Sequence, residues 1–283
     1  MTHEVENDPS ASLSKLLGDI VIPMRPKVMV DLMKERTREE PDFKRIQEII
    51  KGDVGMSAAM IKAASSPLFG GRSKVSGVGQ AVTLLGLKNV MSIATGVAMR
   101  QAMKGGDPVA MERFWDSAEA IAIICGTLAR KLRTVDPDEA YTFGLFHDCG
   151  IPLLTQRHPE YKAVLRDANG ESVRAATDVE DERIGTNHTT VGYFLSRSWM
   201  FSDHLCEAIR FHHDLDTFNR AANMKFPAAR ALIALGHCAE HIQHMRRRGT
   251  EDMEWLKFNE AVLEYLGLGK GEFDDIAEEI LAE

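Results

Sequence analysis

The chain has 283 residues, of which 44% are hydrophobic and 27% charged, and these proportions exclude a disordered or collagen-like chain. It carries 34 lysines and arginines against 42 aspartates and glutamates, a net charge of −8, and a uniformly acidic surface would exclude non-specific binding to nucleic acid. The acidity is local, however, because residues 251–283 hold 11 acids and 2 bases and leave 32 bases and 31 acids in residues 1–250.

The first part of the chain has the pattern of short helices separated by polar or glycine-containing turns. Helices of about 10–12 residues are predicted to begin near Ser12, Arg25, Pro41 and Met56. A loop rich in glycine, serine and proline follows over 65–74. A longer helical stretch then runs over 77–103, with a kink or a boundary predicted at 85–87.

The second part is also helical. In the segment 108–133, apolar residues recur at spacings of three and four, which places them in one stripe of a helix. Another helix is predicted to end near His147, and a polar segment over 167–187 follows it. Further helices are predicted over 188–198, 203–213 and 227–247. No strand-like alternation of useful length occurs, so the sequence predicts an all-α fold.

The breaks between these elements divide the chain into four parts. They are an N-terminal segment over 1–14, an N-terminal helical subdomain over 15–106, a second helical subdomain over 107–250 and an acidic C-terminal extension over 251–283. In the extension, two amphipathic helices are predicted over 253–281 with an interruption at 267–271. They either cover a surface of the same chain, which we favour, or contact a partner.

Two further patterns concern the environment of the protein. No apolar run approaches the roughly 18–20 residues that span a bilayer, and the N-terminus lacks a basic region followed by an apolar segment. We therefore expect a cytoplasmic protein without membrane contact. The four cysteines form no Cys-x-x-Cys pair, so reduced and mostly buried thiols are the expected state.

Several histidines and one aspartate form the strongest chemical signal. His147 and Asp148 stand where an apolar helix meets a glycine turn, and an adjacent imidazole and carboxylate can bind one divalent metal ion. For that pair alone, a surface turn with a helix cap is the alternative. Further along, His188 opens one predicted helix, and His212 and His213 close another. The first of these two lies on the inward face, where it either binds a metal or hydrogen-bonds a carbonyl or carboxylate.

The order of these and other motifs resembles the HDOD domain (HD-related output domain), a helical module of bacterial signalling proteins related to the HD-domain metal-dependent phosphohydrolases. The resemblance extends from about Leu17 to His213. It includes the early helix after Ile22-Pro23 and the motifs Ile61–Gly70, Val75–Leu87, Phe114-Trp115, Phe143–Gly150 and Ala208–His213. It implies a multi-helical, HD-like bundle over 107–250, preceded by the N-terminal helical subdomain.

The resemblance also implies a metal site, formed by His147, Asp148, His188, His212 and His213. Two positions depart from the pattern of the active enzymes. Ser117 occupies or adjoins the place of the first histidine, and His237 stands at the place of the final aspartate. A serine hydroxyl is a poor ligand at neutral pH, whereas the imidazole of His237 remains a possible ligand. A lysine after His-Asp-x-Gly and a Gly-Tyr-Pro motif after His-His are missing as well.

The missing groups are those that would help to activate a water molecule and to stabilise charge on a phosphoryl group, so we expect no turnover. The predicted function is that of a degenerate HD-fold module in bacterial signal transduction, which acts by binding a ligand or a protein. The alternative is a metal-dependent phosphohydrolase or phosphodiesterase acting on a nucleotide or a cyclic dinucleotide. The first function requires no cofactor, although Fe, Mn, Zn or Mg fits the ligand set. The expected partners are a signalling protein or a small anionic ligand, with a second copy of the chain as a further partner.

Two weaker patterns have structural alternatives. His237, His241 and His244 share one helical face, for which we favour a solvated basic face over a metal site. Residues 54–106 contain no acid and six bases. A patch for an anion or for nucleic acid would use Arg72, Lys74 and Lys88. We favour the alternative that a largely apolar part of the bundle needs few charges.

Overall fold

In the computed structural model, residues 20–66, 75–103, 107–219, 224–247 and 252–282 are described. They form helices and connecting turns, with no β-strand among them, so the predicted all-α fold is confirmed. The helices are α2 (Lys27–Arg36), α3 (Phe43–Lys51), α4 (Val54–Ala64), α5 (Val78–Ala102), α6 (Pro108–Leu132), α7 (Pro137–Phe146), α8 (Ile151–Arg157), α9 (Tyr161–Asn169), α10 (Ala176–Ile184), α11 (His188–Ser198), α12 (Asp203–Phe211), α13 (Pro227–Arg247), α14 (Met253–Leu266) and α15 (Lys270–Ala282).

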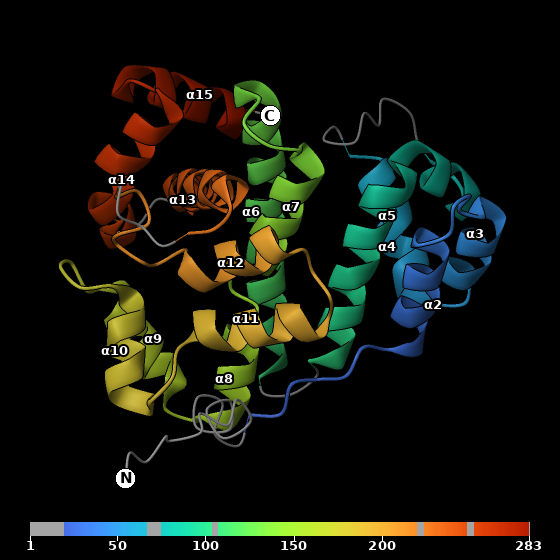
Figure 1. The fold of residues 1–283 in the computed structure, drawn as a ribbon, viewed down its shortest axis with the longest axis horizontal. Coiled ribbons are helices and arrows are strands. Elements are labelled where there is room, and N and C mark those ends of the chain that lie inside the picture. Colours follow the sequence, from blue (N-terminus) through green and yellow to red (C-terminus); the bar gives the residue numbers. More distant parts are fainter. Residues whose placement is uncertain (1–19, 67–74, 104–106, 220–223, 248–251, 283) are drawn as a thin grey trace, which may run out of the picture.

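The helices form two neighbouring groups, α2–α5 and α6–α15, at the right and the left of Figure 1. Within the first group, α5 packs against α2, α3 and α4, and it also contacts α7 of the second group. The long helix α6 packs along α7 and α13. A single hydrophobic core cluster includes residues of both groups, from Ile20 to Ala277. The C-terminal ends of α7 and α12 and the N-terminal end of α11 pack into this core.

Polar caps explain where several helices begin. The Asp107 carboxylate accepts a hydrogen bond from the backbone N–H of Val109, and Pro108 takes the first position of α6, where a missing N–H costs nothing. Asn187 caps α11 in the same way, because its side-chain oxygen accepts from the N–H of Thr190 at 2.8 Å. This cap fixes the first turn of α11 and therefore the place of His188.

Helix α5 contains the predicted kink. It also shows that the expectation of no apolar run long enough to span a bilayer is wrong. Gly86 has φ 71° and ψ 170°, a conformation outside the helical region that a side chain would disfavour. By length and composition α5 would suffice to cross a membrane, and in the described part of the chain no other helix does. Its most apolar window is 56% buried in the structure, as in the core helix of a globular fold.

The segment predicted as a polar excursion, 167–187, contains more helix than the sequence indicates. It includes the end of α9 and all of α10, whose outer face carries the polar residues that suggested a loop. Its inner face buries Ala176, Val179 and Glu180. The helix predicted from Ser12 and most of the glycine-rich loop, 67–74, lie outside the described residues.

The C-terminal extension forms two helices, as predicted, and both contact α13. His237 of α13 stacks on Phe258 with 4.0 Å between ring centroids, and His241 stacks on Trp255 with 4.5 Å. The prediction of a solvated basic face is therefore wrong for these two histidines, because α14 covers them. The carboxylate of Asp252 also pairs with His241, at 2.8 Å from its Nδ1.

All four cysteines are free and buried, as predicted. Burial raises the pKa of the Cys149 and Cys238 thiols, because a thiolate is poorly solvated in an apolar surrounding. These thiols are therefore neutral core residues at physiological pH.

Near the histidines, the backbone at Gly150 lies very close to the first turn of α11. A Cβ on Gly150 would lie 2.1 Å from the carbonyl oxygen of His188 and 3.0 Å from the backbone nitrogen of Gly192. We expect Gly150→Ala to lower the free energy of unfolding by about 3 kcal/mol, because the start of α11 must move away. Urea denaturation measures this loss. Gly271→Ala is the matched control, since its Cβ would meet nothing within 4 Å, and an equal loss in both variants would contradict the prediction.

Candidate metal centre

Four of the predicted metal ligands come together at the ends of three helices. Asp148 follows α7, His188 is the first residue of α11, and His212 and His213 follow α12. Each offers one ligand atom, and these four atoms all lie within 4.8 Å of one another. The fifth predicted ligand, His147, falls in a second group, with Asp148 and Glu240.

The carboxylate of Asp148 lies between the histidines. Its Oδ1 is 3.3 Å from Nε2 of His188 and 3.4 Å from Nε2 of His212. Its Oδ2 is 3.4 Å from Nε2 of His147. Burial opposes its ionisation, but the neighbouring histidines, His147 above all, hold the pKa of Asp148 well below its usual range. The centre therefore contains one carboxylate anion at neutral pH.

Backbone carbonyls orient two of the imidazoles. Nδ1 of His147 lies 3.0 Å from the carbonyl oxygen of Gly144, and Nδ1 of His212 lies 3.0 Å from that of Ile209. A carbonyl oxygen can only accept, so Nδ1 carries the proton and Nε2 of each ring faces the centre. Burial, followed by the neighbouring charge of His213, keeps the pKa of His212 well below its usual value. His212 is thus neutral, the form that binds metal ions.

A buried carboxylate orients His188, and the sequence reasoning missed it. Nδ1 of His188 lies 2.9 Å and 2.8 Å from the two carboxylate oxygens of Glu180, which also accepts from the backbone N–H of His188 at 2.8 Å. The hydroxyl of Tyr161 donates to Glu180 at 2.7 Å. Glu180 is fully buried, at 0% exposure. A carboxylate behind a histidine is the usual second layer of a metal site, because it fixes the tautomer and raises the basicity of the ligand.

His213 has a carboxylate partner of its own, supplied by α14. Oε1 of Glu254 lies 2.5 Å from Nδ1 of His213, and this pairing was also missed. Although burial disfavours the imidazolium, the Glu254 carboxylate raises the pKa of His213 to about 9. Burial also disfavours the Glu254 carboxylate, but the charge of His213 outweighs it and holds the pKa of Glu254 well below its usual value. The C-terminal extension therefore completes the surroundings of a predicted ligand.

The pair of His213 and Glu254 should give the metal-free protein a pH-dependent stability of known sign. His213 titrates at about 6.5 when unfolded and at about 9 when folded, so its contribution is complete below pH ~6.5 and is lost as the pH rises through the folded pKa. Glu254 has a lowered pKa, so its contribution is lost only in acid. From about pH 6 to about pH 9, urea unfolding should show a loss of stability about 2 kcal/mol larger in the wild type than in Glu254→Gln. Equal losses would contradict the assignment.

The atoms that face the centre lack partners. Oδ1 of Asp148, Nε2 of His188 and Nε2 of His212 are buried, and none has a hydrogen-bond partner among the described residues. Buried polar atoms without a partner are costly, so a cluster of them marks a place for an ion or a water molecule. Three imidazoles and one carboxylate are a set of ligands that binds Zn, Mn or Fe. The residues present therefore fit a divalent metal ion.

His147, like His213 and unlike His212, carries an extra proton at neutral pH. Its Nε2 lies 3.3 Å from Oε1 of Glu240, in addition to its contact with Asp148. Burial opposes the charged form, but Asp148 and Glu240 together hold the pKa of His147 well above its usual value. Because Nδ1 already donates to a carbonyl, the extra proton resides on Nε2. A metal ion at this second group would have to displace that proton, just as an ion at the first group would have to displace the extra proton of His213. The second group offers one imidazole where the first offers three, which makes it the weaker of the two for Zn, Mn or Fe.

A cavity of about 460 Å³ opens beside the centre. Ser117, His237 and Ile151 line it together with Asp148 and His188, so both departures from the family pattern face the same space. Nε2 of His237 has no hydrogen-bond partner among the described residues, and burial lowers the pKa of this histidine. Among the described residues, no lysine or arginine lines the cavity, whereas four carboxylates do: Asp148, Glu240, Asp252 and Glu254.

The described residues do not bring together the three bases of the predicted anion patch. Arg72 and Lys74 lie outside them. Nζ of Lys88 donates to the Asp136 carboxylate at 2.6 Å, on the surface where α5 meets the start of α7. Lys88 therefore has a partner within the chain.

Comparison with known proteins identifies the family. The HDOD domain family matches residues 22–215. An uncharacterized protein of Treponema pallidum (strain Nichols) is 24% identical over 213 residues, which make up 73% of this chain and 40% of that protein. The chain thus spans less than half the length of this relative.

Two crystal structures share the fold. An HDOD domain protein with unknown function from Geobacter sulfurreducens superposes with a TM-score of 0.70 at 22% identity, over 97% of both chains. A candidate phosphohydrolase from Shewanella amazonensis SB2B superposes with a TM-score of 0.69 at 24% identity, over 94% of this chain and 93% of that one. Identities this low establish the fold and leave the activity open. Because the family match at residues 22–215 spans more than half of the chain, the protein belongs to the HDOD domain family.

Proposed function

We propose that this protein is a regulatory module of bacterial signal transduction that holds one divalent metal ion and does not turn over a phosphoester. The ligands would be Asp148, His188, His212 and His213. The observation that carries the proposal is the group of buried, unpartnered ligand atoms, each on a side chain that other residues hold in place. Three imidazoles favour Zn, Mn or Fe over Mg, which prefers oxygen ligands.

When bound, a divalent ion supplies Lewis acidity and lowers the pKa of a coordinated water molecule. The chain's own residues perform the remaining tasks. Glu180 and the carbonyl of Ile209 hold protons on Nδ1, which keeps Nε2 of His188 and His212 free to bind. Asp148 supplies the negative charge that attracts the cation. Glu254 holds the ring of His213 from the side of α14.

The cavity beside the centre argues against a phosphoester substrate. Hydrolysis of a phosphodiester develops negative charge that lysine or arginine side chains normally stabilise. Here the lining carries four carboxylates and, in the described part of the chain, no lysine or arginine. Ser117 also occupies or adjoins the position at which the active enzymes carry their first histidine. Acidic walls favour a cation and repel an anionic substrate, so regulation is better supported than catalysis. We also propose a cytoplasmic location, which the burial of α5 in the core supports.

Metal content and phosphodiesterase activity, measured on the same preparation, test the proposal. We expect about one Zn²⁺ or Mn²⁺ per chain after loading and desalting, and no metal-dependent hydrolysis of bis-p-nitrophenyl phosphate or cyclic dinucleotides. Asp148→Asn is the comparison in both assays. Metal-dependent hydrolysis that this variant lacks would overturn the proposal in favour of a phosphohydrolase. A chain without metal would overturn the metal site.

A further inference from the structure

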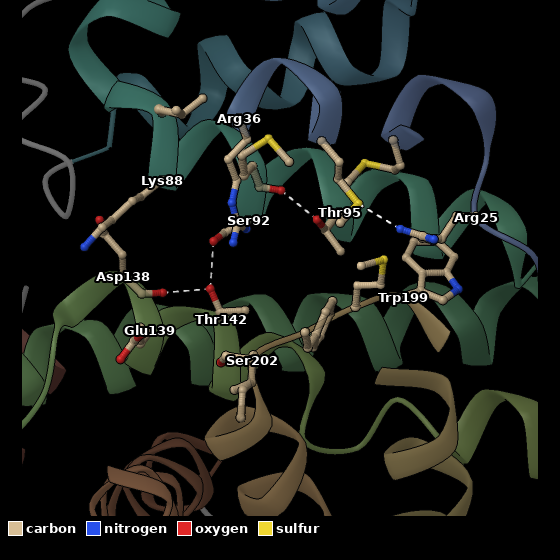
Figure 2. Close-up of a pocket in the computed structure, with 17 residues that line it drawn as sticks. Arg25, Arg36, Lys88, Ser92, Thr95, Asp138, Glu139, Thr142, Trp199 and Ser202 are labelled. Carbon is tan, nitrogen blue, oxygen red and sulfur yellow. Dashed lines mark hydrogen bonds between the residues drawn. The ribbon is translucent and has the colours of Figure 1, made fainter. Parts of the chain in front are cut away.

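A second cavity lies away from the candidate metal centre, where the two groups of helices meet. It has a volume of about 270 Å³ and lies between α2, α5, α7 and the segment that leads into α12 (Figure 2). Its apolar lining is made of Met29, Met33, Leu87, Met91, Trp199, Met200, Phe201 and Leu205. Thioethers and aromatic rings form an adaptable apolar surface, which suits a small organic molecule.

Two arginines at this cavity have no acidic partner among the residues that the structure describes. The guanidinium of Arg25 donates to the thioether sulfur of Met33 at 3.0 Å, and no ion pair with a described acid involves it. Arg36 extends toward Ser92 in Figure 2 and makes no ion pair or hydrogen bond among the described residues. A guanidinium next to an apolar cavity is suited to bind a carboxylate with two parallel hydrogen bonds.

The acids of the same lining, Asp138 and Glu139, make no ion pair with either arginine. Oε1 of Glu139 lies 3.2 Å from Nε2 of His204. The Asp138 carboxylate lies near the Asn89 side chain and the charge of Lys88. Burial, followed by the neighbouring charge of Asp136, raises the pKa of Asp138. Within the described residues, the two guanidiniums therefore have no carboxylate at ion-pair distance.

Three of the four hydroxyl groups of the lining have their protons engaged. Thr142 donates to the carbonyl oxygen of Asp138 at 2.7 Å, so Ser92 must donate to Thr142 across their 2.7 Å contact. Thr95 donates to the carbonyl oxygen of Met91 at 2.7 Å. These three hydroxyl groups can accept from a ligand but not donate to it, whereas the fourth, Ser202, contacts Nε2 of His204. An anion in this cavity would therefore be recognised by the arginines.

The backbone at the mouth of the cavity is strained. Met200 has φ 60°, in the left-handed region that glycine usually occupies after a helix, and its side chain is 61% exposed. The neighbouring Trp199 is buried, and its indole N–H donates to the carbonyl oxygen of Pro23 at 2.9 Å. Met200 therefore ends α11 in the left-handed conformation common at helix C-termini, and Trp199 forms a fixed aromatic wall of the cavity.

Two helices run from this cavity to the candidate metal centre. Asp138, Glu139 and Thr142 lie in the first turns of α7, and α7 is followed directly by His147 and Asp148. Leu205 lies in the first turn of α12, which is followed directly by His212 and His213. The cavity and the metal ligands therefore lie at opposite ends of the same two helices.

We propose that this cavity binds a small amphipathic carboxylate and that its occupancy changes the affinity of the metal centre. The carboxylate would pair with Arg36, with Arg25 on the opposite side, and the apolar body would rest on the methionines and Trp199. The coupling rests on the proposed metal site, whereas binding of the carboxylate does not. By linkage, the metal changes the affinity for the carboxylate by the same factor.

Calorimetric titration with phenylbutyrate tests the cavity on the metal-free protein. Phenylbutanol and phenylbutylamine are matched probes that differ only in their polar group. We expect phenylbutyrate to bind at least about tenfold more tightly than either, and Arg36→Gln to remove that advantage. Arg36 is exposed at the end of α2, so the variant should fold. Arg166→Gln, at a side chain that is 78% exposed on α9, is the control and should change nothing. No binding, or equal binding of the three probes, would overturn the site.

The same titration with Mn²⁺ or Zn²⁺, with and without saturating phenylbutyrate, tests the coupling. We expect the dissociation constant of the metal to change by about fivefold or more, and Arg36→Gln to abolish the change. An unchanged constant in the presence of bound phenylbutyrate would overturn the effector role. A protein that binds phenylbutyrate but no metal would overturn the proposed metal centre and the coupling together, and it would leave the cavity assignment supported.

Discussion

Asp148→Asn is expected to weaken metal binding by at least a hundredfold. Asp148 is the one carboxylate in the four-residue group, and its Oδ1 lies within 3.4 Å of Nε2 of both His188 and His212. Asparagine keeps the shape but removes the charge that attracts a cation. Loss of an outer partner alone typically costs about 10–100-fold in affinity, so loss of the charged ligand should cost more. Competition with a fluorescent chelator measures the dissociation constant.

Asp167→Asn provides the control for this measurement. Asp167 is a carboxylate on α9 whose side chain is 44% exposed, and it pairs with Arg183 on the surface. We expect its replacement to leave metal affinity and stability within the range of ordinary surface substitutions, about 0.5 kcal/mol. If Asp148→Asn retained wild-type affinity, the metal would have to be bound elsewhere.

Glu180→Gln is expected to lower both the stability of the metal-free protein and its metal affinity. The Glu180 carboxylate accepts from the Tyr161 hydroxyl, the His188 backbone N–H and the His188 ring. An amide has only one oxygen for these three donors and directs its own N–H groups at one of them. We expect a loss of about 3 kcal/mol in the free energy of unfolding, because buried donors are left without a partner. Metal affinity should fall by about 10–100-fold.

Glu182→Gln tests whether burial is the reason. Glu182 lies on the same helix two residues away, but its side chain is 65% exposed and pairs with Arg174 at the surface. Its replacement should change stability by less than about 1 kcal/mol. Chemical denaturation and metal titration of both variants make the comparison. Similar losses in the two would show that the paired arrangement around His188 is not what stabilises the site.

The sequence predicted the helical elements well where local signals were strong. The stripe of apolar residues over 108–133 and the glycine at position 86 are local features, and α6 and the kink in α5 follow them closely. The polar segment 167–187 was harder. Glu180 stands among other acids, and only the packing of α10 against its neighbours turns that one carboxylate inward.

The candidate site was predicted only in part for the same reason. The motifs name the residues that supply imidazoles and the carboxylate, because they recur at helix ends in a fixed order. They do not name Glu254, which is 41 residues from His213 in the chain and reaches it only because α14 folds back over α13. That pairing also lies beyond the residues that match the family, 22–215. The acidic lining of the cavity likewise depends on how these helices meet.

The charge of −8 has a structural meaning that composition does not reveal. Part of the acidity of the extension is used internally, since Asp252 pairs with His241 and Glu254 with His213. The extension is therefore a part of the candidate metal centre as well as a cover for α13.

Anomalous diffraction from a crystal soaked in Mn²⁺ or Zn²⁺ tests the metal centre most directly. We predict one strong peak at bonding distance, about 2.0–2.2 Å, from Oδ1 of Asp148 and Nε2 of His188, His212 and His213. The same experiment on Asp148→Asn should show no peak there. A peak at another place, or none in the wild type, would contradict the assignment of these residues as a metal site.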